Sequence, residues 1–395
     1  MADSLLSPSL ITKETLVILV NNLVFASRVN RQFENQFVKI GATLTVRKPN
    51  RFVRTLGPGL QLQNIVEPST SITVSTQSQA SFQFSSQDLT LVIEEFKNRY
   101  LKPAAETIAN GIDYDCASQV PNVANLVGSA GTDPNAYSYL QNLGARMDNL
   151  AVPQEGRTLI LNPDGYWALD AALIGLYVKS VAEPALKGYL AKIANFDIYA
   201  DQNIQRITNG AYAGTGVVNG ANQAGSSIIT NGWTASVTNL FLGGEVIHFA
   251  SVYGVNPQSR QKFNGLAQFT VTGPVSSDSA GNAVIPISPA IVTSGAYQNV
   301  TGSPANLALI TVDSGSKSTD YANNIGFVRD AFGLVTVPME IPGGVDFAAR
   351  EMVRGISMRI IRAYDINSDV MPCRIDVLSG NATFYQELAT RLIGA

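Results

Sequence analysis

Apolar and polar residues alternate with a period of two in the first quarter of the chain, a pattern typical of half-buried β-strands. The longest alternating run extends from Ile72 to Ser85, where apolar or small residues take turns with threonine, serine and glutamine. A shorter alternation opens the segment from Ile40 to Leu56, and the turn residues Gly57-Pro58-Gly59 follow it. We therefore expect an extended β-hairpin whose exposed edges need a partner to cover them.

From Asp88 to Gln119 the period of the pattern changes to that of a helix. Asp88 stands where an N-cap residue is expected, ahead of strong helix formers. Pro103 removes one backbone donor, and we expect it to bend the helix rather than end it, because the apolar face continues beyond it. That face consists of Leu89, Val92, Ile93, Phe96, Tyr100, Ala104, Ile108 and Ile112.

The remaining pattern predicts an α/β layer and a late group of strands. A helix is expected within Leu16–Ala26, a run too short to span a bilayer. Further helices are predicted over residues 134–150, 163–176, 186–196 and 382–393. Strands are predicted over residues 157–161, 196–206, 334–341, 353–366 and 373–378.

A segment with few charged residues lies between the α/β layer and the late group of strands. Between residues 211 and 312 the charged residues are Glu245, Arg260, Lys262 and Asp278, and short β-prone runs recur between turns. The glycine-rich stretch 211–227 is typical of a flexible linker. We expect residues 213–315 to form a small barrel-like or sandwich insertion.

Composition narrows the possible functions. The chain has 395 residues, enough for two or three cores, and a net charge of −3, which gives no general attraction to nucleic acid or anionic membrane. Charged residues make up 14%, well below the usual quarter. A polar but weakly charged surface suits a protein that packs against many copies of itself, although secreted β-rich proteins are similar.

Candidate catalytic motifs are weak. The one histidine, His248, lies in an apolar run, where a hydrogen-bonded strand position is more common than a catalytic base. The S-x-x-K match at Ser314–Lys317 has no accompanying motif, and Gly214-Thr215-Gly216 is not preceded by an apolar strand. Cys116 and Cys373 are far apart and fit no metal or redox spacing, so we expect buried thiols. We predict no catalytic, cofactor-binding or metal-binding residue.

A basic cluster precedes the hairpin tip and has two interpretations. Its residues could contact phosphates or an acidic patch on a neighbouring subunit, and the acidic balance of the chain favours the subunit. Two aromatic residues of the return strand are the other candidates for such a contact. The predicted subunit-contact residues are Arg47, Lys48, Arg51, Arg54, Phe82 and Phe84.

The order of these elements resembles that of tailed-phage major capsid proteins with the HK97-like fold. The insertion run GGEVIHFASVYGVNPQSRQKFNGLAQFTVT resembles that of the P22 coat protein family, and LILNPDGYWALDAAL and VPMEIPGG resemble other parts of the family's chain. The resemblance implies an α+β fold with the following parts: an N-terminal arm (1–38), an extended loop (39–87), a spine helix and P-domain helices (88–150), the first part of the A domain (151–212), an inserted barrel-like domain (213–315), and return strands with a C-terminal helix (316–395).

The same resemblance implies a structural role. The expected protein is a major capsid subunit that self-assembles, as hexamers and pentamers, into an icosahedral shell around double-stranded DNA. It would be made in the host cytoplasm and reside in the virion, with a scaffolding protein, a portal and weakly bound DNA as partners and no membrane. Two alternatives stay open: a tail or baseplate protein whose β insertion binds a receptor, and a secreted carbohydrate-active enzyme.

Overall fold

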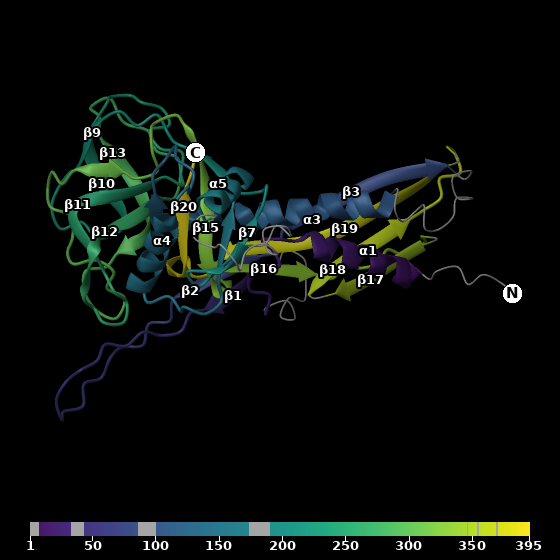
Figure 1. Ribbon diagram of the computed structural model, residues 1–395, viewed down its shortest axis with the longest axis horizontal. Helices are drawn as coiled ribbons and strands as arrows, with labels where there is room; N and C mark the ends of the chain where they lie inside the picture. Colours follow the sequence, from purple (N-terminus) through teal and green to yellow (C-terminus); the bar gives the residue numbers. More distant parts are fainter. Residues whose placement is uncertain are drawn as a thin grey trace. The chain divides into compact units, whose positions relative to one another are not determined.

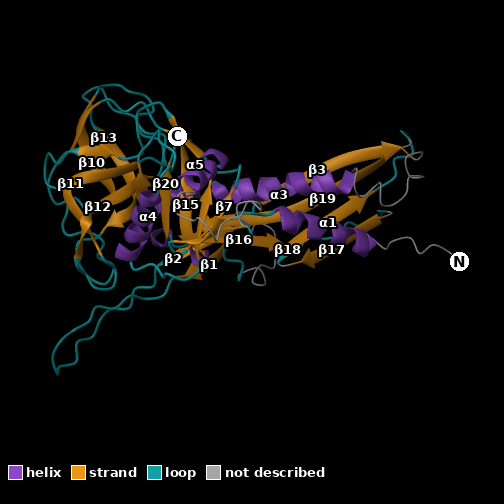
Figure 2. Cartoon of the chain, in the orientation of Figure 1, coloured by secondary structure: helices purple, strands orange, loops and turns teal. Residues whose placement is uncertain are grey.

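A computed structural model divides the chain into two compact units, each assembled from separate stretches of sequence. The first unit contains residues 1–46, 69–117 and 332–384, and the second contains 47–68, 118–331 and 385–395. The structure describes residues 8–32, 43–85, 100–173, 190–345, 347–353, 355–368 and 370–395. Both units mix helices with sheets, as Figure 2 shows, which places the chain in the α+β class.

The first unit is built on a five-stranded sheet with two helices. The strands run in the order β16-β19-β18-β17, and β3 pairs with β19 as well. Helix α3 packs against β3 and β19, and α1 packs against α3 and β17 (Figure 1). The elements of the sheet are β3 (Thr76–Ser85), β16 (Phe332–Val337), β17 (Phe347–Val353), β18 (Ile356–Arg362) and β19 (Val370–Thr383), and the helices are α1 (Pro8–Asn22) and α3 (Lys102–Ala117).

The predicted hairpin is only partly correct. Its first strand, β1 (Thr43–Arg47), pairs with the short β2 (Ser69–Thr73), but the long return run breaks at Val74 and Ser75. The second half of that run, β3, pairs along its length with β19, from Ser85 opposite Val370 to Thr76 opposite Ser379. Alternation reports that one face of a strand is covered and does not say which strand lies beside it. The partner that the exposed edge required is therefore β19.

The helix predicted over residues 88–119 is present in part as α3, from Lys102 to Ala117, with a π-helical turn at Tyr100 and Leu101 before it. Its buried face includes Ile108 and Ile112, as the helical period predicted. Pro103 lies in the first turn of α3, directly after the π-helical residues, so the helix does not end at Pro103. Residues 86–99 lie outside the described part of the chain, and with them the predicted N-cap at Asp88, so the predicted bend stays a prediction.

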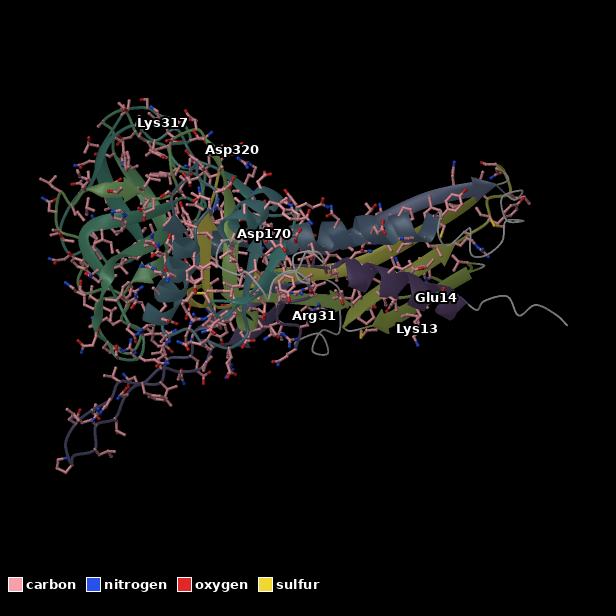
Figure 3. The ribbon with its side chains drawn as sticks, viewed as in Figure 1. Lys13, Glu14, Arg31, Asp170, Lys317 and Asp320 are labelled. Atoms are coloured by element: carbon pink, nitrogen blue, oxygen red, sulfur yellow. The ribbon has the colours of Figure 1, made fainter. Side chains whose placement is uncertain are left out.

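The N-terminal helix is tied to α3 by a buried carboxylate. Asp113 accepts hydrogen bonds from the backbone nitrogens of Val24, at 2.6 Å, and Ala26, at 2.7 Å, just after α1 ends. Arg31, labelled in Figure 3, donates from Nε to the Ala26 carbonyl at 3.0 Å. The turn that follows α1 is thus held by side chains rather than by regular secondary structure.

The second unit contains a seven-stranded sheet. Its strands run in the order β4-β20-β15-β5-β7-β6, with β8 also paired to β15. All five residues of β5 are buried, as expected for a strand covered on both faces. Helices α4 (Tyr137–Asn149) and α5 (Pro163–Leu173) pack their apolar faces on this sheet. The strands are β4 (Leu126–Gly128), β5 (Arg157–Leu161), β6 (Leu190–Ile193), β7 (Phe196–Ala200), β8 (Arg206–Thr208), β15 (Asp320–Val328) and β20 (Ala389–Ile393).

Several helical predictions in this unit are wrong. Residues 190–193 form a strand of a tight hairpin with β7, because Ala194 and Asn195 adopt positive φ angles of 49° and 68°. The predicted C-terminal helix over 382–393 is instead the end of β19, a 3-10 turn (Gln386–Leu388) and β20. All five residues of β20 are buried, Thr390 and Arg391 included, so the run has no alternation of apolar and polar residues that distinguishes strand from helix. Helix α4 begins at Tyr137, not at the predicted Pro134.

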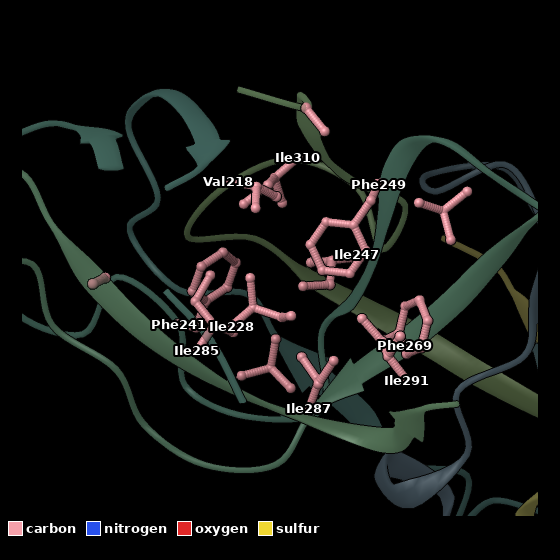
Figure 4. Packing of buried hydrophobic residues seen from close by; sticks show 14 of the residues in the cluster. Val218, Ile228, Phe241, Ile247, Phe249, Phe269, Ile285, Ile287, Ile291 and Ile310 are labelled. Atoms are coloured by element: carbon pink, nitrogen blue, oxygen red, sulfur yellow. The ribbon is translucent and has the colours of Figure 1, made fainter. Parts of the chain in front are cut away.

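The predicted barrel-like insertion is confirmed. Six strands pair in the order β14-β11-β12-β13-β10-β9, and β9 meets the residues before β14 through the Val217–Leu309 bridge, which closes the sheet on itself. Figure 4 shows Ile247, Phe249, Phe269 and Ile285 pointing into a common interior. The strands are β9 (Gly214–Val218), β10 (Gly225–Trp233), β11 (Val246–Val255), β12 (Lys262–Val271), β13 (Ala283–Ile291) and β14 (Ile310–Val312).

The glycine-rich stretch 211–227 is not a linker. It contains β9 and the start of β10, which pair with each other. A Cβ at Gly216 would collide with the ring of Trp233, and Gly214 has a φ of 96° that other residues rarely adopt. Glycine is needed here for close packing against an indole rather than for flexibility.

Candidate functional site

The loop that joins β1 to β2, residues 48–68, has no helix or strand and is largely exposed. Six of its large hydrophobic side chains are between 57% and 86% exposed. They are Phe52, Leu56, Leu60, Leu62, Ile65 and Val66. No charged residue occurs from residue 55 to residue 66. Exposed apolar side chains concentrated on one loop mark a surface for contact with another molecule.

The base of this loop is fixed inside its own unit. Lys48 donates its backbone N–H to the Pro68 carbonyl at 2.8 Å, and the Tyr297 hydroxyl of the barrel donates to the Val66 carbonyl at 2.9 Å. Further out, the side-chain amide of Gln63 accepts from the backbone nitrogen of Val53 at 2.8 Å and also donates to its carbonyl. These bonds hold the two arms of the loop together without a β-ladder.

Arg47, Lys48 and Arg51, three of the four predicted basic contact residues, form contacts at the base of the loop. Arg51 forms an ion pair with Glu387 at 2.6 Å, in a setting about one-third exposed, and its guanidinium lies 5.8 Å from the ring centre of Tyr297. Arg47 pairs with Glu67 at 3.0 Å on the open surface. The pairs are of the exposed or half-exposed kind, which contribute about 0–1 kcal/mol each.

Lys48 is also influenced by the charge of Glu387. Its Nζ lies 5.0 Å from the ring centre of Tyr385. Burial lowers the pKa of Lys48, and Glu387 opposes that shift. Arg54, by contrast, is exposed and makes no hydrogen bond or ion pair with the described residues. The basic residues thus differ in setting: three are engaged at the base of the loop and Arg54 faces outward.

The two aromatic candidates lie in the first unit, on β3. Phe82 is half-buried and stacks on Tyr100 with ring centres 5.9 Å apart. Phe84 pairs by its backbone with Met371 of β19, and its side chain lies outside the described part of the structure. That either residue contacts another subunit stays a prediction.

Sequence reasoning overlooked the apolar residues of the loop itself. It singled out the charged residues before the tip, whereas the structure shows that the uncharged residues beyond them are the most uncovered. A signal was available, because leucine and isoleucine in a turn-rich segment with no charged neighbours have no obvious core to join.

Among the residues of the weak catalytic motifs, His248 and Ser314 form hydrogen bonds within the fold and Lys317 is exposed. His248 Nδ1 lies 2.8 Å from Asp313 Oδ1, and Asp313 Oδ2 accepts a bond from Gln268 at 2.9 Å. Ser314 is buried and accepts from the backbone of Val246, whereas Lys317 is exposed at the surface (Figure 3). The histidine is therefore a hydrogen-bonded strand position, as predicted.

Both cysteines are buried free thiols, which confirms the prediction for them. Burial raises the pKa of Cys373 to about 11. Among the described residues, no group of three or more histidine, cysteine, aspartate and glutamate side chains could hold a metal ion. No helix in the described ranges is long and apolar enough to cross a bilayer.

An α+β chain with an inserted barrel and an exposed apolar loop has the features of a structural subunit that works through contacts. The family model described as P22 coat protein, gene protein 5, matches residues 8–394. The chain belongs to the P22 coat protein family. It is a capsid subunit that forms the shell, and its mixture of helices and sheets is the expected α+β class. A tail or baseplate role is not favoured.

Solved capsid structures resemble the chain at low sequence identity. A chain of Mycobacterium phage Che8 shares 10% identity with a TM-score of 0.48, over 94% of this chain and 90% of that one. The capsid of cyanophage P-SCSP1u shares 11% with a TM-score of 0.45, over 93% and 85%. The capsid of Ralstonia phage GP4 shares 8% with a TM-score of 0.46, over 92% and 86%. No curated protein matches the chain in sequence.

Proposed function

We propose that this chain is the repeating unit of an icosahedral shell around double-stranded DNA, arranged as hexamers and pentamers, and that the 48–68 loop supplies a principal contact between neighbours. The observation that carries this proposal is the set of six exposed hydrophobic side chains on a loop whose outer part, residues 55–66, carries no charge. Family membership supplies the class of assembly.

The energetics favour a lapping contact. Burying a leucine or isoleucine side chain fully contributes about 1.5–3 kcal/mol. Several such residues on one loop, covered by one neighbour, offset much of the entropy lost on association, which costs about 4–15 kcal/mol. A loop whose base is already fixed by hydrogen bonds loses less conformational entropy when it binds than a mobile one. Contacts of this strength, repeated around each subunit, give a stable but reversible assembly.

The proposed roles of the other parts follow the family pattern. Residues 1–38 act as an N-terminal arm, 39–87 as the extended loop, and 88–150 as the spine helix with P-domain helices. Residues 151–212 and 316–395 form the A and P domains, and the barrel of residues 213–315 stabilises the subunit or its contacts. Arg47, Lys48, Arg51, Arg54, Phe82 and Phe84 are proposed contact residues, of which Arg54 is the one best placed to meet an acidic patch.

Other partners are proposed on chemical grounds. A net charge of −3 supports only weak, non-specific contact with packaged DNA. A scaffolding protein and a portal would guide closure of the shell, because identical apolar contacts alone also permit open assemblies. The chain would be made in the host cytoplasm and end in the virion.

The test is to make the loop polar. In the double variant Leu60→Ser/Leu62→Ser, both side chains are 86% exposed, so the fold should keep its circular dichroism spectrum and melting temperature. We expect shell formation to fall by at least about tenfold, as measured by sedimentation velocity, since about 3–6 kcal/mol of burial is lost per contact. Val284→Ser, an exposed aliphatic residue on β13, is the matched control.

Normal shells from the double variant would contradict the role of the loop. A double variant that fails to fold gives no reading on assembly, and Leu56→Ser, at a third exposed position, then replaces it. Loss of assembly in Val284→Ser to the same extent would show that any exposed aliphatic residue matters and would remove the special role of the loop.

A further inference from the structure

A cavity of about 370 Å³ lies within the second unit, between the barrel, α4 and the base of the 48–68 loop. Its walls are mainly apolar and include Phe263, Phe269, Val292 and Val300. This volume lies within the range of small-molecule sites, which are mostly apolar with a few placed polar groups. The charged residues that line it are Arg51, Arg146 and Glu387.

Arg146, on α4, is the one of these three that forms no ion pair with the described residues. Its Nη2 donates to Asn125 Oδ1 at 3.1 Å, and its Nη1 reaches the Leu266 carbonyl only at 3.4 Å, beyond the usual range. Its Nε has no hydrogen-bond partner among the residues that the structure describes and is closed to solvent, so a ligand in the cavity would meet the Nη1 and Nη2 edge of the guanidinium. The guanidinium lies 5.2 Å from the ring centre of Phe263, one wall of the cavity. Burial lowers the pKa of Arg146 to about 10, and Asp313 opposes that shift.

The acids nearby are committed to other partners. Glu387 is paired with Arg51 at 2.6 Å. Asp313 accepts bonds from Gln268 at 2.9 Å and lies 2.8 Å from His248 Nδ1, so it does not contact Arg146 directly. The two arginines and one glutamate of the lining leave one positive charge in excess.

The amides of the lining are also committed. Asn125 donates to the Ala389 carbonyl at 3.3 Å while it accepts from Arg146. Both ends of the Gln268 amide are used, one by Asp313 and the other by the backbone of Leu126. The cavity is therefore lined by apolar walls and by a half-buried cation that has no ion-pair partner among the described residues, and an anion in the cavity would stabilise that cation.

We propose that this cavity binds a small apolar monocarboxylate, with the carboxylate on the Arg146 guanidinium and the apolar body against Phe263, Phe269 and Val300. Arginine recognises carboxylates through paired N–H donors, and such charge-assisted bonds are about twice as strong as neutral ones. The apolar walls supply the remaining affinity. This binding does not depend on shell formation, so the two proposals fail separately.

The test uses the full-length, unassembled chain and isothermal titration calorimetry with 4-phenylbutyrate. We expect saturable binding with one site per chain and a dissociation constant in the micromolar to submillimolar range. The neutral 4-phenylbutanamide has nearly the same shape and should bind at least about tenfold more weakly, because it cannot form the ion pair.

Three variants separate the cavity from general effects. Arg146→Met should weaken 4-phenylbutyrate by at least about tenfold and remove its advantage over the amide. Val292→Phe keeps Arg146 but fills the cavity, and it should abolish binding of both compounds. Arg54→Met removes an exposed cation elsewhere in the same unit and should leave both affinities unchanged. Circular dichroism and melting curves show that each variant is folded.

Several results would overturn the proposal. They are the absence of saturable binding at millimolar 4-phenylbutyrate, equal affinity for the acid and the amide, and an unchanged preference for the acid in folded Arg146→Met. Binding of a short apolar peptide through its C-terminal carboxylate, with no binding of 4-phenylbutyrate, would also reject a small molecule as the occupant. If Arg146→Met does not fold, the Val292→Phe variant and the acid–amide comparison decide the question.

Discussion

One fully buried arginine joins three parts of the second unit. Arg391, on β20, donates from Nε to the Val123 carbonyl at 2.6 Å, from Nη1 to the Gly244 carbonyl at 2.7 Å, and from Nη2 to Thr270 Oγ1 at 3.2 Å. Burial lowers the pKa of Arg391 to about 9, and the buried Glu245 opposes that shift. Because Gly244 and Thr270 belong to the inserted segment and Val123 precedes the sheet, this side chain connects the barrel to the α/β layer.

Replacing this side chain should destabilise the whole unit. In Arg391→Met the carbonyls of Val123 and Gly244 lose their donor inside the protein, and we expect the free energy of unfolding to fall by at least about 3 kcal/mol. Urea unfolding of the unassembled chain, followed by circular dichroism, measures this loss. Arg206→Met is the matched control, because Arg206 is exposed and donates to the Ala395 and Asp320 carbonyls at the surface. A change below about 1 kcal/mol for Arg391→Met would show that the joint is held by other contacts.

At the level of elements, the clearest sequence patterns belong to elements with one covered face. The alternation of residues 76–85 and the helical stripe around Ile108 and Ile112 each appear as a strand and a helix. The barrel strands were recognised because β-prone runs recur between turns. Where both faces are covered, as in β20, the period disappears, and the choice between helix and strand depends on distant partners.

The 48–68 loop shows that contacts between residues far apart in the sequence could not be predicted. Charged residues near its base were easy to notice, but their partners, Glu387 and Tyr385, are more than 300 residues away in the sequence. The cavity with Arg146 was invisible for the same reason. Its walls come from α4, β12 and the segments around Val292 and Glu387, and only the closed barrel brings them together.

The docking of α1 provides an element-level prediction. Asp113 receives two backbone hydrogen bonds from the turn after α1, and bonds to a charged group contribute about 1.5–3 kcal/mol each. In Asp113→Ala we expect α1 to exchange its amide hydrogens at least about tenfold faster, while the barrel strands keep their protection. Hydrogen–deuterium exchange with mass spectrometry of residues 8–26 measures this difference.

Glu106→Ala is the control for that experiment. Glu106 is exposed on the same helix, so its removal should change exchange in α1 very little. Unchanged exchange of α1 in Asp113→Ala would mean that packing on α3 and β17, rather than the carboxylate, holds the helix in place.

At the scale of the whole molecule, low charge and exposed apolar residues act in the same direction. Charged residues make up 14% of the chain, which limits repulsion between copies, and six exposed hydrophobic side chains lie on one loop. A chain of this kind favours contact with its own copies over contact with nucleic acid. Because a capsid subunit works through contacts between copies, the proposed role needs no catalytic cluster.

The most direct test of this account is electron microscopy of the purified full-length chain, expressed alone and with a scaffolding protein. We predict closed shells of uniform diameter, built from rings of five and six subunits, with the 48–68 loop of each subunit lying on its neighbour. A chain that stays strictly monomeric by light scattering under every assembly condition, with no shells in the micrographs, would contradict the central claim.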